Sequence, residues 1–483
     1  LFLSRVDGVH WADDNVARRL YANREKGEAF GMRAMFMYYL LQAHGGYDDS
    51  GKLLGVPIVT TPEGASSNFN LPRNTFAECM KAIYDDCDSA LALLPDKYTD
   101  IASESDIPAY YKQMGADVDR MNRVFGSKFN GRMDASIVKA FRSKAALLAA
   151  SPAFSAESGT TYQQAADYAA QVLDAIGGIS GMDPTGWTWY ANNSEIDGLS
   201  NGANPKEVMW RGEKASNNDW ETDNYPPSLY GKGRINPTQN FVDAFPAANG
   251  YPITDPRSDY DPSDPYSNRD PRLTAYVVVD GGAVGVNNTV INTEKGSGKD
   301  GINNEVGSST RTGYYLRKLL RQDINLDPKV NSKQFHYTPR IRYTEIFLNY
   351  AEAANEAFGP KGTGTHAYSA YDVIKAIRHR AGITDDSYLD ECAESKDKMR
   401  ELIRNERRIE LSFEGFRFWD LRRWKAPITE TAKGMSIATD NNGLKTYTPI
   451  DVETRDYKDY MYYGPIPYSE MLKFSELKQN KGW

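Results

Sequence analysis

Aromatic side chains are concentrated in one stretch of the chain, where amides and carboxylates lie between them. The aromatic residues are Trp187, Trp189, Tyr190, Trp210, Trp220, Tyr225 and Tyr230, and the polar residues between them include Asn217, Asn218, Asp219 and Asp223. A sugar ring has an apolar face of C–H groups and a rim of hydroxyls. An aromatic ring can cover the face, and Asn or Asp can hydrogen-bond the rim. The composition of this stretch therefore suits the binding of a carbohydrate.

The sequence around each aromatic residue indicates whether its side chain is buried or exposed to solvent. Trp210 ends a β-prone run (EVMW, 207–210) and is expected in the core, whereas Trp220, Tyr225 and Tyr230 lie among turn residues. For these three, packing within the loop remains an equal alternative to ligand contact. The residues predicted to bind the ligand are Trp220, Tyr225, Tyr230, Asn218, Trp187 and Trp189, together with Tyr47 and Asp48 from a loop near the N-terminus.

The chain shows no catalytic or metal-binding motif, so we predict no catalytic residue, no metal and no cofactor. Patterns of serine hydrolases, zinc proteases, phosphate loops and CxxC sites do not occur, and the five histidines are scattered singly. Acids are abundant, which keeps a catalytic carboxylate pair open as an alternative, but no pair stands out. The acidic run 255–272 could offer oxygen ligands to Ca²⁺, yet it lacks the Gly and terminal Glu of an EF-hand loop. A proline-stiffened turn with aspartate caps is the expected structure there.

Charge and composition exclude several classes of partner. The net charge of −8 over 483 residues disfavours nucleic acid and anionic membrane surfaces. No apolar run reaches 18 residues, so no transmembrane helix is expected.

The three cysteines form no zinc pattern, and Cys79 and Cys87 lie about 12 Å apart on a predicted helix, too far for a disulfide. The sequence begins at Leu1 without a visible signal peptide, and we expect a mature or shortened form.

The elements that must position these residues are mainly helices. Helices are predicted at 15–43, 75–94, 135–150, 162–176, 342–358 and 366–380, from apolar periodicity and from Gly or Pro at their ends. Two of the resulting pairs, 135–176 and 342–380, have about the length of a tetratricopeptide unit. The stretch between them is rich in Gly, Asn, Pro and Asp and is predicted to be an irregular insert with short strands.

Four regions follow from this pattern. They are an N-terminal helical repeat region at 1–176, a loop-rich insert that binds the ligand at 177–338, a C-terminal repeat pair with a long helix at 339–425, and a loop-rich cap at 426–483. The predicted fold class is therefore mainly α, with tetratricopeptide-like helix pairs that carry the insert.

The stretch 399–425 has the densest charge pattern and is predicted to be one long helix. Apolar residues recur along one face, and Arg407 lies three and seven residues before Glu410 and Glu414. Arginines and acids are balanced, which argues against a phosphate-binding surface. We expect a partly buried lattice of ion pairs, including Arg408 and Glu410, that holds the helix against the rest of the fold.

Several of these segments resemble those of the SusD/RagB family, the glycan-capture lipoproteins of bacterial outer membranes. The similar segments, in order, are GMRAMFMYYLLQAHGG with GVPIV, LPRNTFAECMKAIYDDCDSALALLP, NPTQNFVDAFPAANGYPI with DPYSNRDPRL, TGYYLRKLL, RIRYTEIFLNYAEAANEAFG, RNERRIELSFEGFRFWDLRRW and the ending YGPIPYSEM. The resemblance covers essentially the whole chain. Two departures are the missing N-terminal lipoprotein signal and the additional residues 47–54 before GVPIV.

The resemblance implies a non-enzymatic protein of tetratricopeptide-like helix pairs. It would capture an oligosaccharide or polysaccharide at the cell surface and deliver it to a SusC-like TonB-dependent transporter. A lipid on an N-terminal cysteine, outside this sequence, would anchor it in the outer membrane. The alternatives are a carbohydrate-active enzyme that uses a carboxylate pair, and a transporter lid for a non-sugar nutrient such as peptide.

Overall fold

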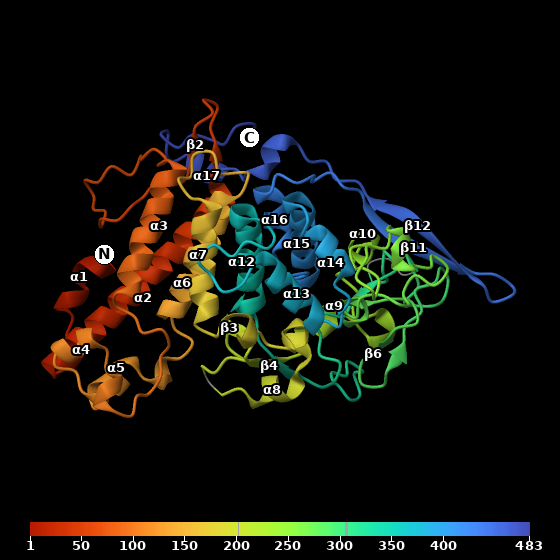
Figure 1. The fold of residues 1–483 in the computed structure, drawn as a ribbon, viewed down its shortest axis with the longest axis horizontal. Helices are drawn as coiled ribbons and strands as arrows, with labels where there is room; N and C mark the ends of the chain where they lie inside the picture. The colour runs from red at the N-terminus through yellow and green to blue at the C-terminus, as the bar shows by residue number, and fades with distance from the viewer. Residues whose placement is uncertain (201, 305–307) are drawn as a thin grey trace.

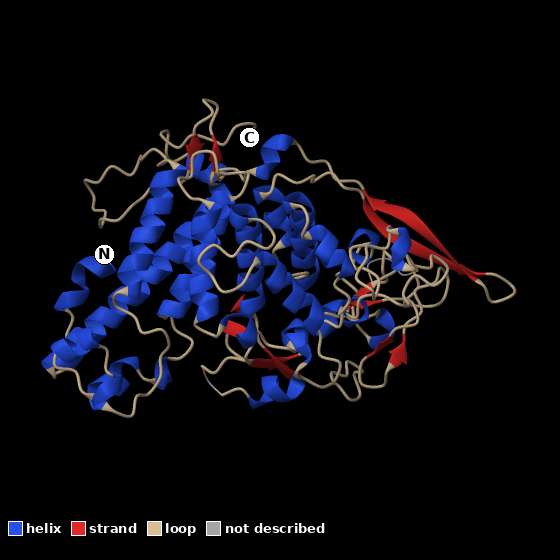
Figure 2. Cartoon of the chain, in the orientation of Figure 1, coloured by secondary structure: helices blue, strands red, loops and turns tan. Residues whose placement is uncertain are grey.

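A computed structural model describes residues 1–200, 202–304 and 308–483. Helices hold 42% of the chain and strands 10%, which confirms the mainly α prediction (Figure 2). The larger helices stand side by side in a row that follows the sequence, and the loop-rich insert lies partly below this row and partly beyond its last helices (Figure 1).

The helices outside the insert and before residue 426 include all six predicted between residues 15 and 380, with ends that differ from the prediction by up to four residues, and several helices that were not predicted. They are α1 (Phe2–Arg5), α2 (Asn15–His44), α3 (Phe76–Leu91), α4 (Ala109–Gln113), α5 (Val118–Phe125), α6 (Ala135–Ala150), α7 (Tyr162–Asp174), α12 (Tyr343–Phe358), α13 (Ala370–Arg380), α14 (Ser387–Cys392), α15 (Lys396–Glu410) and α16 (Arg417–Arg423). Thr75 caps α3 in a capping box with Glu78, and Ser369 caps α13 with Asp372, so α13 begins later than predicted.

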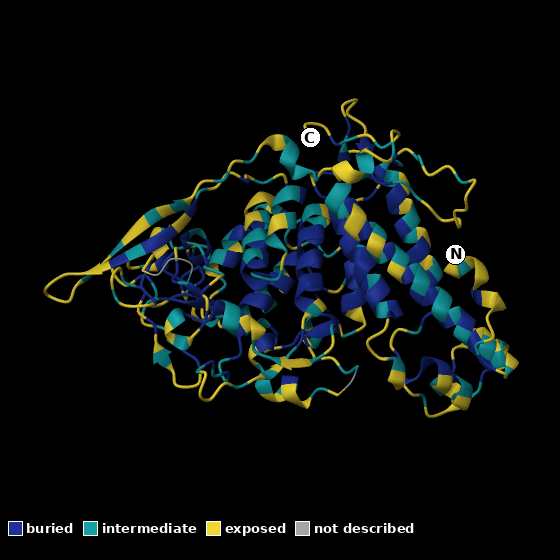
Figure 3. Ribbon diagram, turned by 180° about the vertical axis from the view of Figure 1, so that it is seen from behind, coloured by how far each residue is buried: buried dark blue, intermediate teal, exposed yellow. Residues whose placement is uncertain are grey.

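Small residues let the helices of the row approach closely. α6 is buried along almost its whole length, and α7 buries its alanines against it and against α12. In α2, a Cβ at Gly31 would lie 2.8 Å from the Met133 Cγ, which is closer than side chains normally pack. The middle helices therefore form the main core, seen as the buried centre of Figure 3.

The insert consists of short elements joined by loops. They are α8 (Asn193–Gly198), β3 (Val208–Arg211), β4 (Ala215–Asn217), α9 (Asp219–Asn224), α10 (Gln239–Val242), α11 (Arg272–Tyr276), β5 (Val277–Val278), β6 (Ala283–Val284), β7 (Thr289–Val290), β8 (Tyr315–Leu316) and β9 (Gln334–His336), followed by β10 (Pro339–Arg342). The antiparallel pairs are β3 with β10, β4 with β9, β5 with β8 and β6 with β7. The predicted strand at 207–210 is confirmed with a shift of one residue.

The C-terminal region contains a hairpin that the prediction of a loop-rich cap missed. β11 (Ala432–Thr439) and β12 (Lys445–Glu453) pair antiparallel and project from the body of the molecule (Figure 2). The signal was present as alternating β-branched residues in KTYTPIDVE and as the turn at Gly443, whose φ is +81°. A last short helix, α17 (Tyr468–Met471), follows.

The predicted single helix over 399–425 is wrong, because the chain breaks between α15 and α16. Phe413 and Gly415 both adopt left-handed backbone conformations, with φ of +62° and +85°. The break separates Arg407 from Glu414, which were predicted to share one helix. Arg407 instead binds Asp420, with 2.7 Å between Nε and the carboxylate.

A buried network of ion pairs surrounds the end of α15. Its carboxylates reach cations from distant segments: Glu406 binds Arg272 (2.8 Å) and Arg378 (3.1 Å), Glu410 binds Arg272 (3.0 Å) and Arg380 (3.0 Å), and Glu414 binds Arg342 (2.7 Å) and Lys318 (2.7 Å). Arg272 begins α11 in the insert, whereas Arg378 and Arg380 belong to α13. This ion-pair network therefore joins the insert to the helical row.

The two residues predicted to support the lattice differ in role. Glu410 is fully buried, and burial alone would favour its neutral form. Arg380, Arg272, Arg342 and Lys318 outweigh that effect and lower the pKa of Glu410 to about 2. Arg408 is half-buried and donates to the carbonyl of Asn240 at 2.8 Å, outside the ion-pair network.

Glu410→Gln is expected to destabilise the fold by about 3–5 kcal/mol, because it leaves buried cations without their partner. Chemical denaturation monitored by circular dichroism measures the loss. Glu401→Gln is the matched control on the same helix: Glu401 is 73% exposed and lies 3.4 Å from Arg404, so a change below about 0.5 kcal/mol is expected. Equal losses in the two variants would contradict the central role of Glu410.

The stability difference between the native chain and the Glu410→Gln variant should depend on pH. The pKa of Glu410 is lowered on folding from 4.5 to about 2, so its contribution is complete above pH 4.5 and is lost as the pH falls toward 2. The stability difference between the native chain and Glu410→Gln should therefore be larger at pH 7 than at pH 3.

Asp134 caps the buried helix α6, but burial of its carboxylate disfavours the charged form. Its carboxylate accepts the Ile137 N–H at 2.9 Å, and the residue is 9% exposed. Burial raises the pKa of Asp134 from 3.8 to about 7. Because the folded state holds the proton more tightly, the ionised side chain destabilises the fold as the pH rises from about 4 through 7.

Asp134→Asn should keep the cap and remove this cost. The variant is expected to gain stability over the native chain between pH 5 and pH 8, by more than about 1 kcal/mol at pH 8. Melting curves at a series of pH values test this. Asp117→Asn at the half-exposed cap of α5 is the control, and a similar gain there would argue against burial as the cause.

Candidate functional site

An aromatic pocket of about 180 Å³ lies between the insert and the turn that follows α15. Its lining residues are Trp189, Tyr190, Ile196, Trp220, Leu319, Phe335, His336, Tyr337, Thr338, Pro339, Phe413 and Glu414. We call this the aromatic pocket. It combines exposed aromatic rings at the edge with polar groups below, which is the arrangement that suits an amphipathic ring.

Trp220 stands at the edge of the aromatic pocket on a firmly held helix. It is 39% exposed and is the second residue of α9. Before it, the Asn218 amide donates to the Ser332 carbonyl at 2.9 Å. After it, the buried Glu221 carboxylate accepts the Arg321 backbone N–H at 2.8 Å. These anchors hold the α9 backbone that carries the indole in place before any ligand arrives, which lowers the entropic cost of binding.

Phe335 forms a second exposed aromatic surface of the pocket. It is 37% exposed and lies on β9 opposite Ser216 of β4. The Lys214 ammonium sits 4.3 Å from the ring centroid and donates to the carbonyls of Asp197 and Leu199. This cation–π contact supports the orientation of the ring.

Two buried hydrogen-bond donors lie among the lining residues. Trp189 and Tyr337 are 5% and 8% exposed, and their ring centroids are 5.5 Å apart. Within the described parts of the chain, the Trp189 Nε1 and the Tyr337 hydroxyl have no hydrogen-bond partner. Burial also raises the pKa of Tyr337, which keeps the hydroxyl protonated. Buried polar groups are normally paired, so these two unpaired donors are exceptions, and both atoms are inaccessible to solvent.

An ionisable pair supports the wall of the pocket. The His336 Nε2 lies 3.4 Å from the Glu221 Oε2, and Glu221 is fully buried.

The carboxylate of Glu414, which also lines the pocket, is held by Arg342 and Lys318. Burial favours its neutral form, but these two cations keep the pKa of Glu414 below its usual value.

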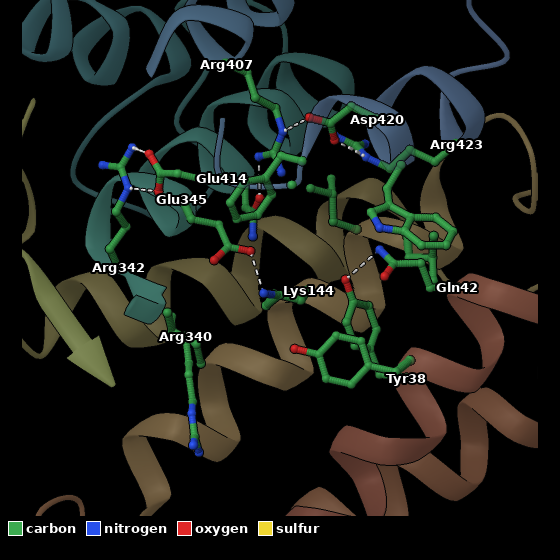
Figure 4. Close-up of a pocket in the computed structure, with 18 of the residues that line it drawn as sticks. Tyr38, Gln42, Lys144, Arg340, Arg342, Glu345, Arg407, Glu414, Asp420 and Arg423 are labelled. Atoms are coloured by element: carbon green, nitrogen blue, oxygen red, sulfur yellow. Dashed lines mark hydrogen bonds and ion pairs between the residues drawn. The ribbon is translucent and has the colours of Figure 1, made fainter. Parts of the chain in front are cut away.

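A second, charged pocket adjoins the aromatic one (Figure 4). Its volume is about 190 Å³, and it shares Pro339 and Glu414 with the aromatic pocket. Figure 4 shows its ion pairs Lys144 with Glu345, Arg342 with Glu414, and Asp420 between Arg407 and Arg423. We call this the charged pocket. The charges drawn in these pairs are balanced by their partners, so they offer little attraction to an ionic ligand.

Two residues that line the charged pocket, Tyr39 and Arg340, take no part in its ion pairs. Tyr39 of α2 is 43% exposed. Arg340 points away from the ion pairs, and its guanidinium lies 4.5 Å from the centroid of the Trp210 ring (Figure 4). Trp210 itself is 7% exposed, which confirms the prediction that it is a core residue.

The structure brings together two of the eight residues predicted to bind the ligand, Trp189 and Trp220. Trp187 is half-buried, and its carbonyl accepts the Tyr276 hydroxyl. Tyr225 is 1% exposed, and its hydroxyl donates to the Arg321 carbonyl, so its ring belongs to the core of the insert.

The remaining four predicted residues lie outside the aromatic pocket. Tyr230 is 57% exposed and lines a different hollow, and Asn218 anchors α9. Tyr47 and Asp48 belong to a small hairpin of β1 (Gly46–Tyr47) and β2 (Leu53–Leu54) beside the C-terminal segment (Figure 1). The Asp48 carboxylate accepts the N–H groups of Ser50 and Lys52 and thereby stabilises this turn.

Sequence reasoning missed Phe335, Tyr337 and Phe413. The alternation of QFHYTPRIR at 334–342 is typical of strands, and it could have predicted that Phe335 and Tyr337 share one face. Phe413 gave no such signal, because its place depends on the left-handed turn that follows α15.

The acidic run 255–272 forms a turn assembly. Asp255 binds Arg257, whose guanidinium also reaches Glu391, and Asp261 accepts the Ser263 N–H. Among the residues that the structure describes, no group of three or more His, Cys, Asp or Glu side chains could hold a metal ion. The same described residues contain no helix long and apolar enough to cross a membrane.

Two family models match the chain. Residues 191–483 match the model described as "SusD family", and residues 8–111 match one described as "Starch-binding associating with outer membrane". A "SusD-like protein P38" of Formosa agariphila is 29% identical over 130 residues, which are 27% of this chain and only 23% of that relative.

Solved structures share the fold over the full chain. A SusD-like protein from Bacteroides fragilis aligns with a TM-score of 0.72 at 24% identity and covers 100% of this chain and 83% of its own. A SusD-like carbohydrate-binding protein from the same species aligns with a TM-score of 0.64 at 21% identity and covers 99% and 83%. At these identities the likeness concerns the fold alone. The family model spans more than half of the sequence, and the chain therefore belongs to the SusD family.

Proposed function

We propose that this protein captures a glycan in the aromatic pocket without acting on it chemically. The observation that carries the proposal is the convergence of Trp189 and Trp220, 31 positions apart in the sequence, on one pocket with Phe335 and Tyr337. Aromatic rings can cover the apolar face of a sugar, and the exposed rings of Trp220 and Phe335 are available for this. Solved relatives described as carbohydrate-binding support this assignment.

The chemistry of the pocket supports binding rather than hydrolysis. A glycosidase needs two carboxyl groups on either side of the bond, and one of them must have a raised pKa. Glu414 is the carboxylate among the lining residues, and Arg342 and Lys318 lower its pKa. Release of reducing sugar by the purified protein would contradict this part of the proposal.

We also propose that the protein works at the outer membrane, on the cell surface, beside a SusC-like TonB-dependent transporter. The family description "associating with outer membrane" supports the location. A lipid on a cysteine upstream of Leu1 would supply the anchor, and the transporter would receive the captured glycan. Co-purification with such a β-barrel from detergent extracts tests the partnership.

Trp220→Ala is expected to weaken glycan binding by about tenfold, because an aromatic contact contributes about 0.5–1.5 kcal/mol beyond the area that it buries. Affinity electrophoresis against starch, laminarin, xylan, mannan, pectin and alginate identifies a ligand, and isothermal titration calorimetry measures the change.

Tyr230→Ala is the matched control for this prediction. Tyr230 is also an exposed aromatic residue of the insert, at 57%, but lies outside the aromatic pocket. Its loss should leave affinity unchanged. A loss of binding in Tyr230→Ala with full binding in Trp220→Ala would place the site elsewhere.

A further inference from the structure

A second hollow shares Trp220 with the aromatic pocket. This outer groove has a volume of about 270 Å³ and is lined by Asp219, Trp220, Asp223, Asn224, Arg234 and Ile235. Because Trp220 lines both hollows, the two lie next to each other at this residue. Each hollow alone is smaller than the roughly 300–1,000 Å³ of sites that hold drug-sized ligands. Each therefore has room for a small unit such as one sugar ring.

The outer groove is built from backbone that is held in place. The segment after Lys232 runs along α9: the Arg234 N–H donates to the Asp223 carbonyl at 3.0 Å, and the Ile235 N–H donates to the Asn224 side chain at 3.2 Å. The Asn224 amide also donates to the Trp220 carbonyl at 2.9 Å. The backbone of the groove and that of Trp220 are thus held together.

Polar groups with room for a ligand line this groove. The Asp223 carboxylate lies 3.1 Å from both the Lys232 ammonium and the Arg234 guanidinium. The side chains of Asp223 and Arg234 are 38% and 58% exposed, so each keeps hydrogen-bonding capacity toward solvent. Carboxylate and guanidinium groups beside an indole can bind the hydroxyl rim of a sugar that stacks on the ring.

We propose that the aromatic pocket and the outer groove are two subsites for one glycan chain that passes across Trp220. The proposal rests on the function assigned above and specifies its ligand: a chain of at least two or three sugars, bound along its length. A free monosaccharide fills one hollow and leaves the contacts of the other unused. Affinity should therefore rise with chain length until both hollows are occupied.

Calorimetry with a length series tests the proposal. The series is prepared by partial hydrolysis of whichever polysaccharide the protein retains, from one to six sugars. We expect affinity to rise at least tenfold between the monosaccharide and the tetrasaccharide and then to level off. Phe335→Ala, in the aromatic pocket, should weaken binding at every length, whereas Arg234→Ala should weaken only the longer members, by about fivefold for one lost hydrogen bond.

Lys232→Ala is the matched control. Lys232 binds the same carboxylate at the same distance as Arg234 but lines neither hollow, so its loss should leave every affinity unchanged. Circular dichroism confirms the fold of each variant. Equal affinity for the monosaccharide and the hexasaccharide, or equal effects of Arg234→Ala and Lys232→Ala, would overturn the two-subsite proposal while leaving glycan capture intact. Failure of every polysaccharide to bind would overturn both.

Discussion

The carboxylates of Glu406 and Glu410 are withdrawn from water, and the fold must therefore bring cations to them. A buried ion without a partner is far more costly than an exposed one. The partners come from two separate parts of the chain, Arg272 of the insert and Arg378 with Arg380 of α13. The insert and the helical row consequently cannot separate without breaking these pairs, and the irregular insert gains a fixed position on a rigid support.

This constraint extends to the candidate site. Just after Glu410 the chain turns through the left-handed Phe413, and Glu414 then binds Arg342 and Lys318. Phe413 and Glu414 both line the aromatic pocket, and Glu414 also lines the charged pocket. The ion-pair network thereby sets one wall of the site, while the anchored helix α9 presents Trp220 at its edge. A site assembled in this way is preorganised, which lowers the entropic cost of binding a ligand.

The helical part of the fold was predictable because its signals are local. Caps such as Thr75, alanine-rich faces and terminal glycines lie within a few residues of the elements that they define. The break between α15 and α16 was not predictable in the same way. The sequence there keeps helical periodicity, and the left-handed turn forms where Glu410 and Glu414 meet cations from segments about 30 to 140 residues away.

For the site, the sequence by itself determined the chemistry: a loop-rich insert with aromatic rings among amides and carboxylates, on a mainly helical support. It did not determine which rings line a cavity. Trp220 and Tyr225 are five residues apart in the same local composition, yet Trp220 is 39% exposed and Tyr225 is buried. Tertiary structure decided between them, because the Tyr225 hydroxyl finds the Arg321 carbonyl, 96 residues away, in the core of the insert. Trp220 lies on α9 where Phe335 and Tyr337, from a distant segment, complete the pocket around it.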